Sequence, residues 1–126
     1  MSIDIEKLAY IQDVFINKHL QKEKSILHQI KEIEDAFQNL PVFIPAYTTR
    51  HREEAYPNYR IFFIWNRRNK ILEVSYGNAQ SPDEDVLMYR RDVLKDLPYE
   101  DLVELEPYLG DFVNFVFETL CNKDNV

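Results

Sequence analysis

The sequence predicts an α+β protein with an N-terminal helical pair, a small antiparallel β-sheet with a central hairpin at about 59–76, and C-terminal helices packed on the sheet. Three patterns support this fold class. Apolar residues recur at three- and four-residue steps through 3–40, alternate with polar residues in the hairpin, and return to helical spacing in 77–126. At 126 residues, the chain is expected to form a single domain spanning 1–126.

The N-terminal segment carries two apolar stripes at helical spacing, one in residues 5–15 and one in residues 26–40. Between them, residues 18–24 contain only one apolar side chain. This interval fits either a pause on one long helix or a turn between two antiparallel helices. Ser25 is a residue type that caps helix N-termini, so the pattern favours two helices.

The middle of the chain has the composition of β-strands. Residues 42–49 are β-rich, but Pro45 cannot donate a ladder hydrogen bond, which confines this strand to a sheet edge or a bulge. Residues 59–65 are apolar on both alternating faces apart from Arg60, as in a covered central strand, and residues 70–76 alternate apolar with polar side chains. The polar tetrapeptide 66–69 between them predicts a hairpin loop.

The last part of the chain returns to helical patterns. Residues 81–84 form a capping box with proline at the first helical position, which predicts a helix running to about Lys95. A short helix is expected to begin at Leu97 and to end at Pro107. A last helix follows Gly110 and is apolar on most sides, so we expect it at the centre of the core.

The sequence lacks the motifs of the common cofactor and metal sites. Its two glycines, Gly77 and Gly110, are too far apart to form a glycine-rich phosphate loop. One cysteine and three dispersed histidines give no zinc motif, so neither a cofactor nor a metal ion is expected. The first residues show no secretory pattern and no apolar run is long enough to span a bilayer, so we expect a cytoplasmic protein without membrane contact.

The formal charge of −7 is unevenly distributed along the chain. Residues 1–40 hold five lysines and seven acidic residues, 41–80 hold six basic and three acidic residues, and 81–126 hold four basic and twelve acidic residues. All seven arginines lie between positions 50 and 91. The arginines therefore either pair with the acidic C-terminal helices or form the basic end of a bipolar surface.

Small size, acidity, uneven charge and missing catalytic motifs favour a non-enzymatic protein that binds another protein and inhibits it. The most concrete form is a bacterial or phage immunity or anti-defence inhibitor of a nucleic-acid-processing enzyme. Carboxylates would then occupy a basic groove of the target in place of phosphates. The acidic binding face consists of Asp92, Asp96, Glu100, Asp101, Glu104, Glu106 and Asp111.

Two other functions stay open at this point. A nucleic-acid-associated module would use an Arg/Tyr-rich β-hairpin, on which bases stack beside cationic side chains. A small hydrolase would use a dispersed site around His51. A homodimer through the strand at 42–49 or through the N-terminal helices also fits the pattern. The basic and aromatic set consists of Arg50, Arg52, Tyr56, Tyr59, Arg60, Arg67, Arg68 and Lys70.

Overall fold

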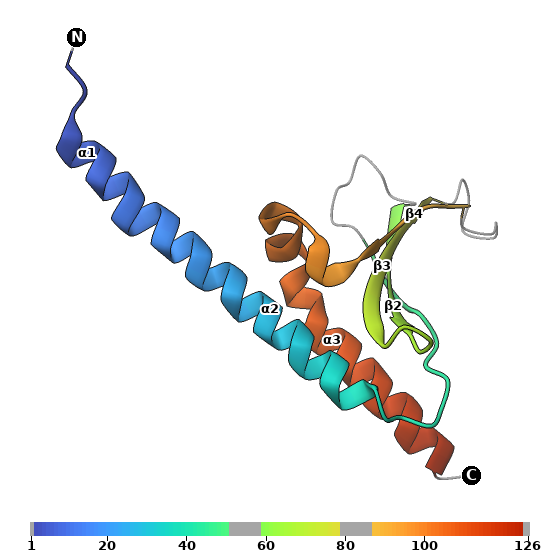
Figure 1. The fold of residues 1–126 in the computed structure, drawn as a ribbon. Helices are drawn as coiled ribbons and strands as arrows, with labels where there is room; N and C mark the ends of the chain where they lie inside the picture. Colours follow the sequence, from blue (N-terminus) through green and yellow to red (C-terminus); the bar gives the residue numbers. More distant parts are fainter. Residues whose placement is uncertain (1, 51–58, 79–86, 125–126) are drawn as a thin grey trace.

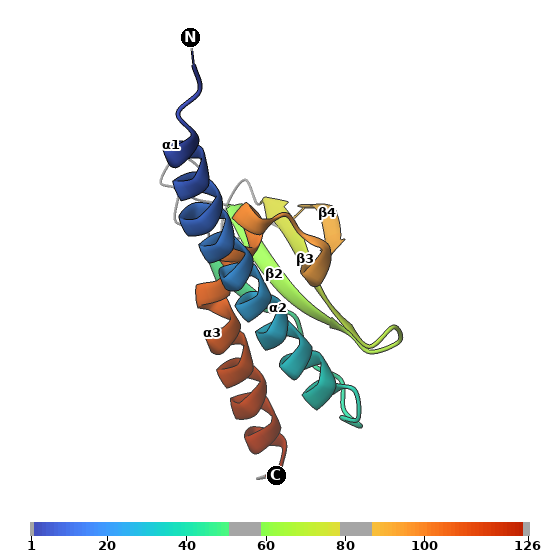
Figure 2. The same cartoon turned by 60° about the vertical axis from the view of Figure 1, so that its left-hand side comes forward.

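The computed structural model describes residues 2–50, 59–78 and 87–124, and helices from both ends of the chain pack against one face of a four-stranded antiparallel sheet, while the N-terminal part of the first helix extends away from it (Figures 1 and 2). The α+β fold class is therefore confirmed. In chain order the elements are α1 (Ile5–Tyr10), the π-helical turn η1 (Ile11–Ile16), α2 (Asn17–Phe37), β1 (Tyr47–Arg50), β2 (Tyr59–Asn66), β3 (Ile71–Asn78), β4 (Leu87–Val93), the 3-10 turn η2 (Leu94–Asp96) and α3 (Tyr99–Asp124).

The elements α1, η1 and α2 follow one another without a break and form a single long helix (Figure 1). The prediction of an N-terminal helical pair is therefore wrong. The polar interval at 18–24 consists mainly of Lys, Gln, Glu and Leu, which favour helix, and it contains no Gly or Pro that would end one. The helix begins after Asp4, whose side chain accepts a hydrogen bond from the backbone N–H of Lys7 at 3.1 Å.

The turn η1 is π-helical, so side chains five positions apart come together within it. The rings of Tyr10 and Phe15 accordingly meet edge to face, with their centroids 5.7 Å apart. The same wide turn keeps Ile11 and Ile16 on one side of the helix. The apolar side chains before and after the turn therefore share one side.

The four strands pair in the order β1-β2-β3-β4, and every neighbouring pair is antiparallel. β2 and β3 pair along their whole length, which confirms the hairpin at about 59–76. In its loop, the side chain of Asn66 accepts a hydrogen bond from the backbone N–H of Asn69 at 3.0 Å, and Lys70 has a left-handed φ of 58°. β1 lies at the sheet edge, but it begins at Tyr47, so the strand predicted over 42–49 is shorter at its start and Pro45 lies before it in the irregular segment 42–46.

Residues 87–93 form the edge strand β4 instead of the helix that was expected to run to Lys95. The capping box at 81–84, on which that expectation depended, lies outside the described residues. β4 pairs with β3, whose outer edge would otherwise present a row of unpaired backbone N–H and C=O groups. Strand pairing in the folded sheet therefore outweighs the local helical pattern.

The helix α3 is unbroken over Tyr99–Asp124, so the short helix expected to end at Pro107 and the separate helix expected after Gly110 are one element. Pro107 has no N–H and removes one helical hydrogen bond. Leu105 and Leu109, on either side of the proline, are both buried in the core. Packing of both halves against the same core outweighs the loss of one backbone bond.

The core lies between the inner face of the sheet and the helices α2 and α3 (Figure 2). Phe112 of α3 is 0% exposed and stacks on Phe63 of β2, with their ring centroids 5.7 Å apart. Phe37 of α2 packs edge to face against Trp65 of β2 at 5.6 Å. The C-terminal helix therefore packs on the sheet at the centre of the core, as its sequence predicts.

Candidate protein-binding surface

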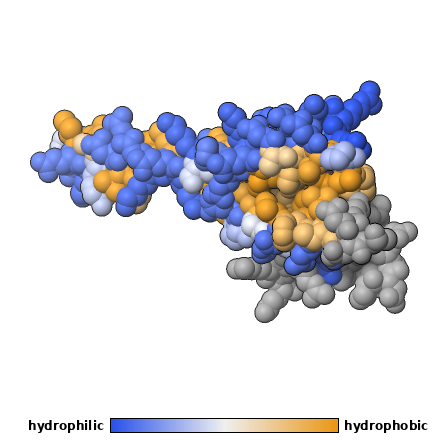
Figure 3. All heavy atoms as spheres, turned by 90° about the horizontal axis from the view of Figure 1, so that it is seen from below, coloured by the Kyte–Doolittle hydropathy of each residue, from blue (hydrophilic) through white to orange (hydrophobic). Residues whose placement is uncertain are grey.

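The N-terminal half of the long helix carries large apolar side chains that the rest of the described chain leaves exposed. Figure 3 shows hydrophobic residues at intervals along this part of the molecule. Their relative exposures run from 47% to 78%. We call this set the projecting stripe, and it consists of Ile5, Leu8, Ile11, Phe15, Ile16 and Leu20.

The long helix leaves the body of the protein near His19. The ring of His19 contacts Tyr99 at the start of α3. One turn further along, Lys22 forms an ion pair with Glu106 of α3 at 2.5 Å. N-terminal to these contacts, the helix extends away from α3 and the sheet (Figure 1). The extending segment 5–18 is about 21 Å long at 1.5 Å per residue.

The projecting stripe differs from the rest of the same helix in what covers it. Ile26 and Ile30 of α2 are each 1% exposed and belong to the core, whereas Leu8 and Leu20 are each 51% exposed. The N-terminal half of the long helix, which we call the projecting helix, is therefore amphipathic, and no described residue buries its apolar side. Its polar side chains follow at three- and four-residue steps, at Asp13, Asn17, Gln21 and Lys24.

A groove of about 470 Å³ separates α2 from α3 on the body of the protein. Its walls are mainly apolar and include Ile33, Ala36, Leu109 and Val113, while Gly110 contributes no side chain. This lining suits contact with an apolar group better than it suits proton transfer.

Part of the predicted acidic face comes together on α3. Glu100, Glu104 and Asp111 are exposed, and their spacing of four and seven residues places them on one side of the helix. Glu118, seven residues further, extends the row and is also exposed. Sequence reasoning missed Glu118, although helical spacing within an unbroken α3 would have found it. We call these four residues the acidic row.

The remaining residues of the predicted acidic face lie apart from this row. Asp96 is exposed in the turn η2, and Asp92 and Asp101 are half-buried. Glu106 lies toward α2, where its carboxylate forms the ion pair with Lys22. The carboxylates that share one surface are therefore those of α3 alone.

The predicted basic hairpin divides into two groups at opposite ends of β2. Arg67, Arg68 and Lys70 are exposed in the loop that joins β2 to β3. Arg60 is half-buried near the other end of β2, where its cross-strand partner on β1 is Arg50. The positions of Arg60 and Arg67 are about 23 Å apart along an extended strand. The two groups therefore do not form one compact basic patch.

Several residues that the hairpin hypothesis requires do not belong to the described part of the chain. Arg52, Tyr56 and His51 lie outside the described residues, and Tyr59 is the first residue of β2. Trp65, which lies between the two basic groups, is buried against the core and does not offer a stacking face. The hydrolase hypothesis around His51 likewise has no described site.

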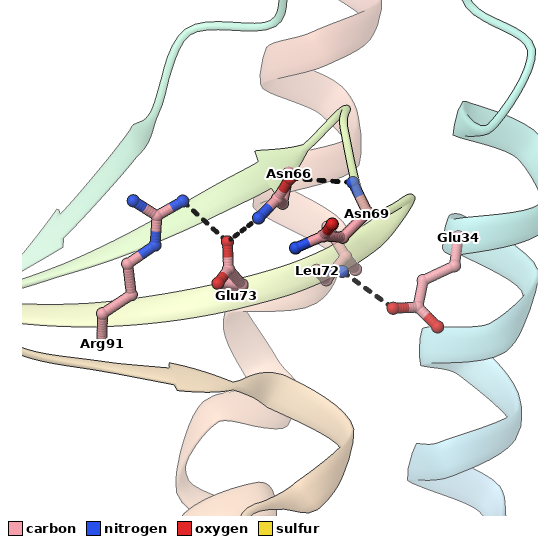
Figure 4. A network of polar contacts seen from close by, with 6 residues as sticks. All are labelled: Glu34, Asn66, Asn69, Leu72, Glu73 and Arg91. Atoms are coloured by element: carbon pink, nitrogen blue, oxygen red, sulfur yellow. Dashed lines mark hydrogen bonds and ion pairs between the residues drawn. The ribbon is translucent and has the colours of Figure 1, made fainter.

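Figure 4 shows a polar network across the sheet that sequence reasoning missed. The carboxylate of Glu73 accepts hydrogen bonds from the Arg91 guanidinium at 2.7 Å and from the Asn66 amide at 2.8 Å. Arg91 therefore pairs within the sheet and not with the C-terminal helix, which the internal-pairing hypothesis expected. Finding this pair from sequence would require the register of β4 against β3, which no local pattern supplies.

Glu34 of α2 is buried, at 8% exposure, and its side chain reaches the sheet (Figure 4). Its carboxylate accepts a hydrogen bond from the backbone N–H of Leu72 at 2.8 Å and lies 3.6 Å from the Lys95 ammonium. The last residue of β4, Val93, pairs with Glu73, so β4 ends one position short of Leu72. Glu34 therefore satisfies the donor that a longer β4 would have satisfied, which indicates a structural role.

Tyr47 of β1 packs against Phe112 and Phe115, with ring centroids 6.1 and 5.2 Å away. Burial raises the pKa of its phenol above the ordinary value of 10.0, and the carboxylate of Asp111 raises the pKa further. A group whose pKa is higher in the folded state stabilises the fold fully below the unfolded-state pKa, and the contribution is lost as pH rises through the folded-state pKa.

We therefore expect the free energy of unfolding to fall more steeply above about pH 10 in the wild-type protein than in Tyr47→Phe, which cannot ionise. Urea denaturation at a series of pH values measures both slopes. Identical slopes in the two proteins would contradict the burial of the Tyr47 phenol against α3.

Within residues 2–50, 59–78 and 87–124, no group of three His, Cys, Asp or Glu side chains is placed to hold a metal ion. In the same part of the chain, no helix combines the length and the apolar character needed to cross a membrane. No protein-family model matches the chain, and comparisons with curated proteins and with solved structures found no match. Function is therefore inferred from the surfaces themselves.

Proposed function

We propose that this is a non-enzymatic protein that acts by binding other polypeptide chains, and that the projecting helix is its principal binding element. The observation that carries the proposal is the exposure of the projecting stripe. Its six large apolar side chains recur at the spacing of one helix side, on a helix that extends away from the body (Figure 1). Large apolar side chains that recur along one side of a helix and stay exposed are typical of an interaction site.

Covering the projecting stripe would stabilise a complex substantially. Fully burying one Leu, Ile or Phe side chain contributes about 1.5–3 kcal/mol, and the stripe residues are about half exposed before binding. Together they offer roughly 5–9 kcal/mol before the entropic cost of association. An exposed ion pair contributes only about 0–1 kcal/mol. Apolar contact is therefore the larger source of affinity.

The acidic row on α3 supports a finer form of this proposal. Exposed carboxylates at regular spacing favour a target with a basic surface, and such charges accelerate association at low salt. A nucleic-acid-processing enzyme has a basic surface where it binds the phosphate backbone of its nucleic-acid substrate. We therefore propose an immunity or anti-defence type of inhibitor as the specific form of this binding protein.

A photo-cross-linking phenylalanine analogue placed at Phe15 is expected to join the chain to another polypeptide in cells that produce the protein. The matched control is the same analogue at Gln21, which is exposed on the polar side of the same helix. Gel electrophoresis and mass spectrometry identify the products. Strong cross-linking at position 15 with little at position 21 supports the proposal, and equal yields or no product at either position contradict it.

A further inference from the structure

We propose that the partner of the projecting stripe is a second copy of this chain, paired antiparallel along the N-terminal helix. This inference rests on the proposed function, because it names the occupant of the same surface. An apolar stripe alone accepts any apolar partner. The charges on the same helix, described next, distinguish a second copy in one orientation from other partners.

The charges along the projecting helix have opposite signs at its two ends. Residues 2–13 hold three acidic residues and one lysine, whereas residues 14–24, which continue onto the body of the protein, hold three lysines and one acidic residue. Of these lysines, Lys22 pairs with Glu106 of α3, and Lys18 lies on the extending segment. Asp4 at the acidic end and Lys18 at the basic end are both exposed. The helix is therefore complementary in charge to a copy of itself that runs in the opposite direction.

An antiparallel pair brings Asp4 of each copy beside Lys18 of the other, whereas a parallel pair brings like charges together. Antiparallel helix dipoles also attract each other. The contact has two-fold symmetry, so each copy uses the same surface and the assembly closes at two chains. Leu8, Ile11 and Phe15 then lie in the middle of the contact and are removed from water.

The shape of the molecule leaves room for this arrangement. The segment 5–18 extends beyond the contact of His19 with Tyr99, where α3 begins. Its length of about 21 Å accommodates the corresponding segment of a second copy alongside it, at the helix separation of about 8–10 Å found in packed pairs. The second helix would cover the side that α3 covers further along the same helix.

Sedimentation equilibrium of the full chain tests the inference. The average molecular mass should rise toward the mass of two chains as the protein concentration increases. Leu8→Glu/Phe15→Glu should weaken self-association by at least about a hundredfold, because it places four charges in the apolar contact of the dimer. Asn17→Glu/Gln21→Lys adds two charges per chain on the polar side of the helix without changing its net charge, and should change the dissociation constant by less than about threefold. Circular dichroism confirms that each variant keeps its helix content.

A mass of one chain at every concentration would overturn the inference, and so would equal weakening by the stripe variant and its polar-side control. The orientation has its own test. Asp4→Lys and Lys18→Glu should each weaken the dimer by about tenfold, and combining them in one chain should restore it. In a parallel pair each position meets itself, so neither single change would alter the repulsion. Single variants that associate like the wild type would therefore overturn the antiparallel arrangement.

The cross-linking experiment at Phe15 separates this inference from the proposed function. A product containing two copies of the chain supports the dimer. A product with a different polypeptide, together with a monomeric wild type, overturns the dimer and leaves the proposed function standing. No product at Phe15 contradicts the proposed function itself.

Discussion

Replacing Phe112 by alanine is expected to lower the free energy of unfolding by about 3–5 kcal/mol. The Phe112 ring is 0% exposed and contacts the rings of Phe63 at 5.7 Å and Phe37 at 5.9 Å. It therefore lies where α3, β2 and α2 meet, and alanine would leave a cavity that three separate elements line. Urea denaturation followed by circular dichroism measures the change.

The matched control for this variant is Phe117→Ala on the same helix. Phe117 is 66% exposed, so its truncation should change the free energy of unfolding by less than about 0.5 kcal/mol. Both changes remove the same ring from α3, and both replace it with a residue that favours helix. Similar losses in the two variants would contradict the position of Phe112 at the centre of the core.

Glu34→Ala is expected to lower the free energy of unfolding by about 2–3 kcal/mol. The Glu34 carboxylate accepts the hydrogen bond from the backbone N–H of Leu72, a residue that is itself fully buried. Alanine would leave this N–H without an acceptor in the interior, at the position where β4 has already ended. The measurement is the same denaturation experiment at neutral pH.

Two further variants isolate the role of the Glu34 carboxylate. Glu34→Gln keeps an acceptor oxygen but not the charge, so its loss should be smaller than that of the alanine variant. Asp35→Ala removes an exposed carboxylate from the next position of α2 and should change stability by less than about 0.5 kcal/mol. A loss in Asp35→Ala as large as in Glu34→Ala would show that the effect arises from helix charge and not from the bond to the sheet.

The β2–β3 hairpin could be predicted from sequence because all of its signals are local. Leu72 and Val74 alternate with Glu73, and the structure buries the first two on the inner face of the sheet. The polar loop residues Asn66 and Asn69 then form the hydrogen bond that closes the turn. Each of these features depends on residues within one short stretch of chain, which is why periodicity and loop chemistry were sufficient.

The edge strand β4 and the continuous N-terminal helix could not be predicted in the same way. The strand at 87–93 contains four polar or charged residues in a row at 89–92, and its extended form depends on pairing with β3. A turn at 18–24 was expected because this interval holds only one apolar side chain and Ser25 could cap a second helix. Periodicity indicates an amphipathic helix, but it does not indicate whether the apolar side is covered within the molecule.

The candidate binding surface was accessible to sequence reasoning in part. Helical spacing was sufficient to place Glu100 and Glu104 together, because both lie within the helix expected before Pro107. The helix end expected at Pro107 obscured the continuation of this row to Glu118. The ion pair of Arg91 with Glu73 depends on the register of β4 against β3, so it could not be predicted from the sequence.

The π-helical turn at Ile11–Ile16 has a consequence for the direction in which the binding helix faces. One residue of an α-helix corresponds to a rotation of about 100° about its axis. A π-helical turn holds about one residue more than an α-helical turn, so the chain from Ile11 to Ile16 rotates by about as much as an α-helix that is one residue shorter. Deleting Gln12 would therefore convert η1 to an ordinary helical turn and leave the direction of α1 relative to α2 nearly unchanged. The wide turn thus takes up one residue without turning the exposed apolar side away from the buried side of the same helix.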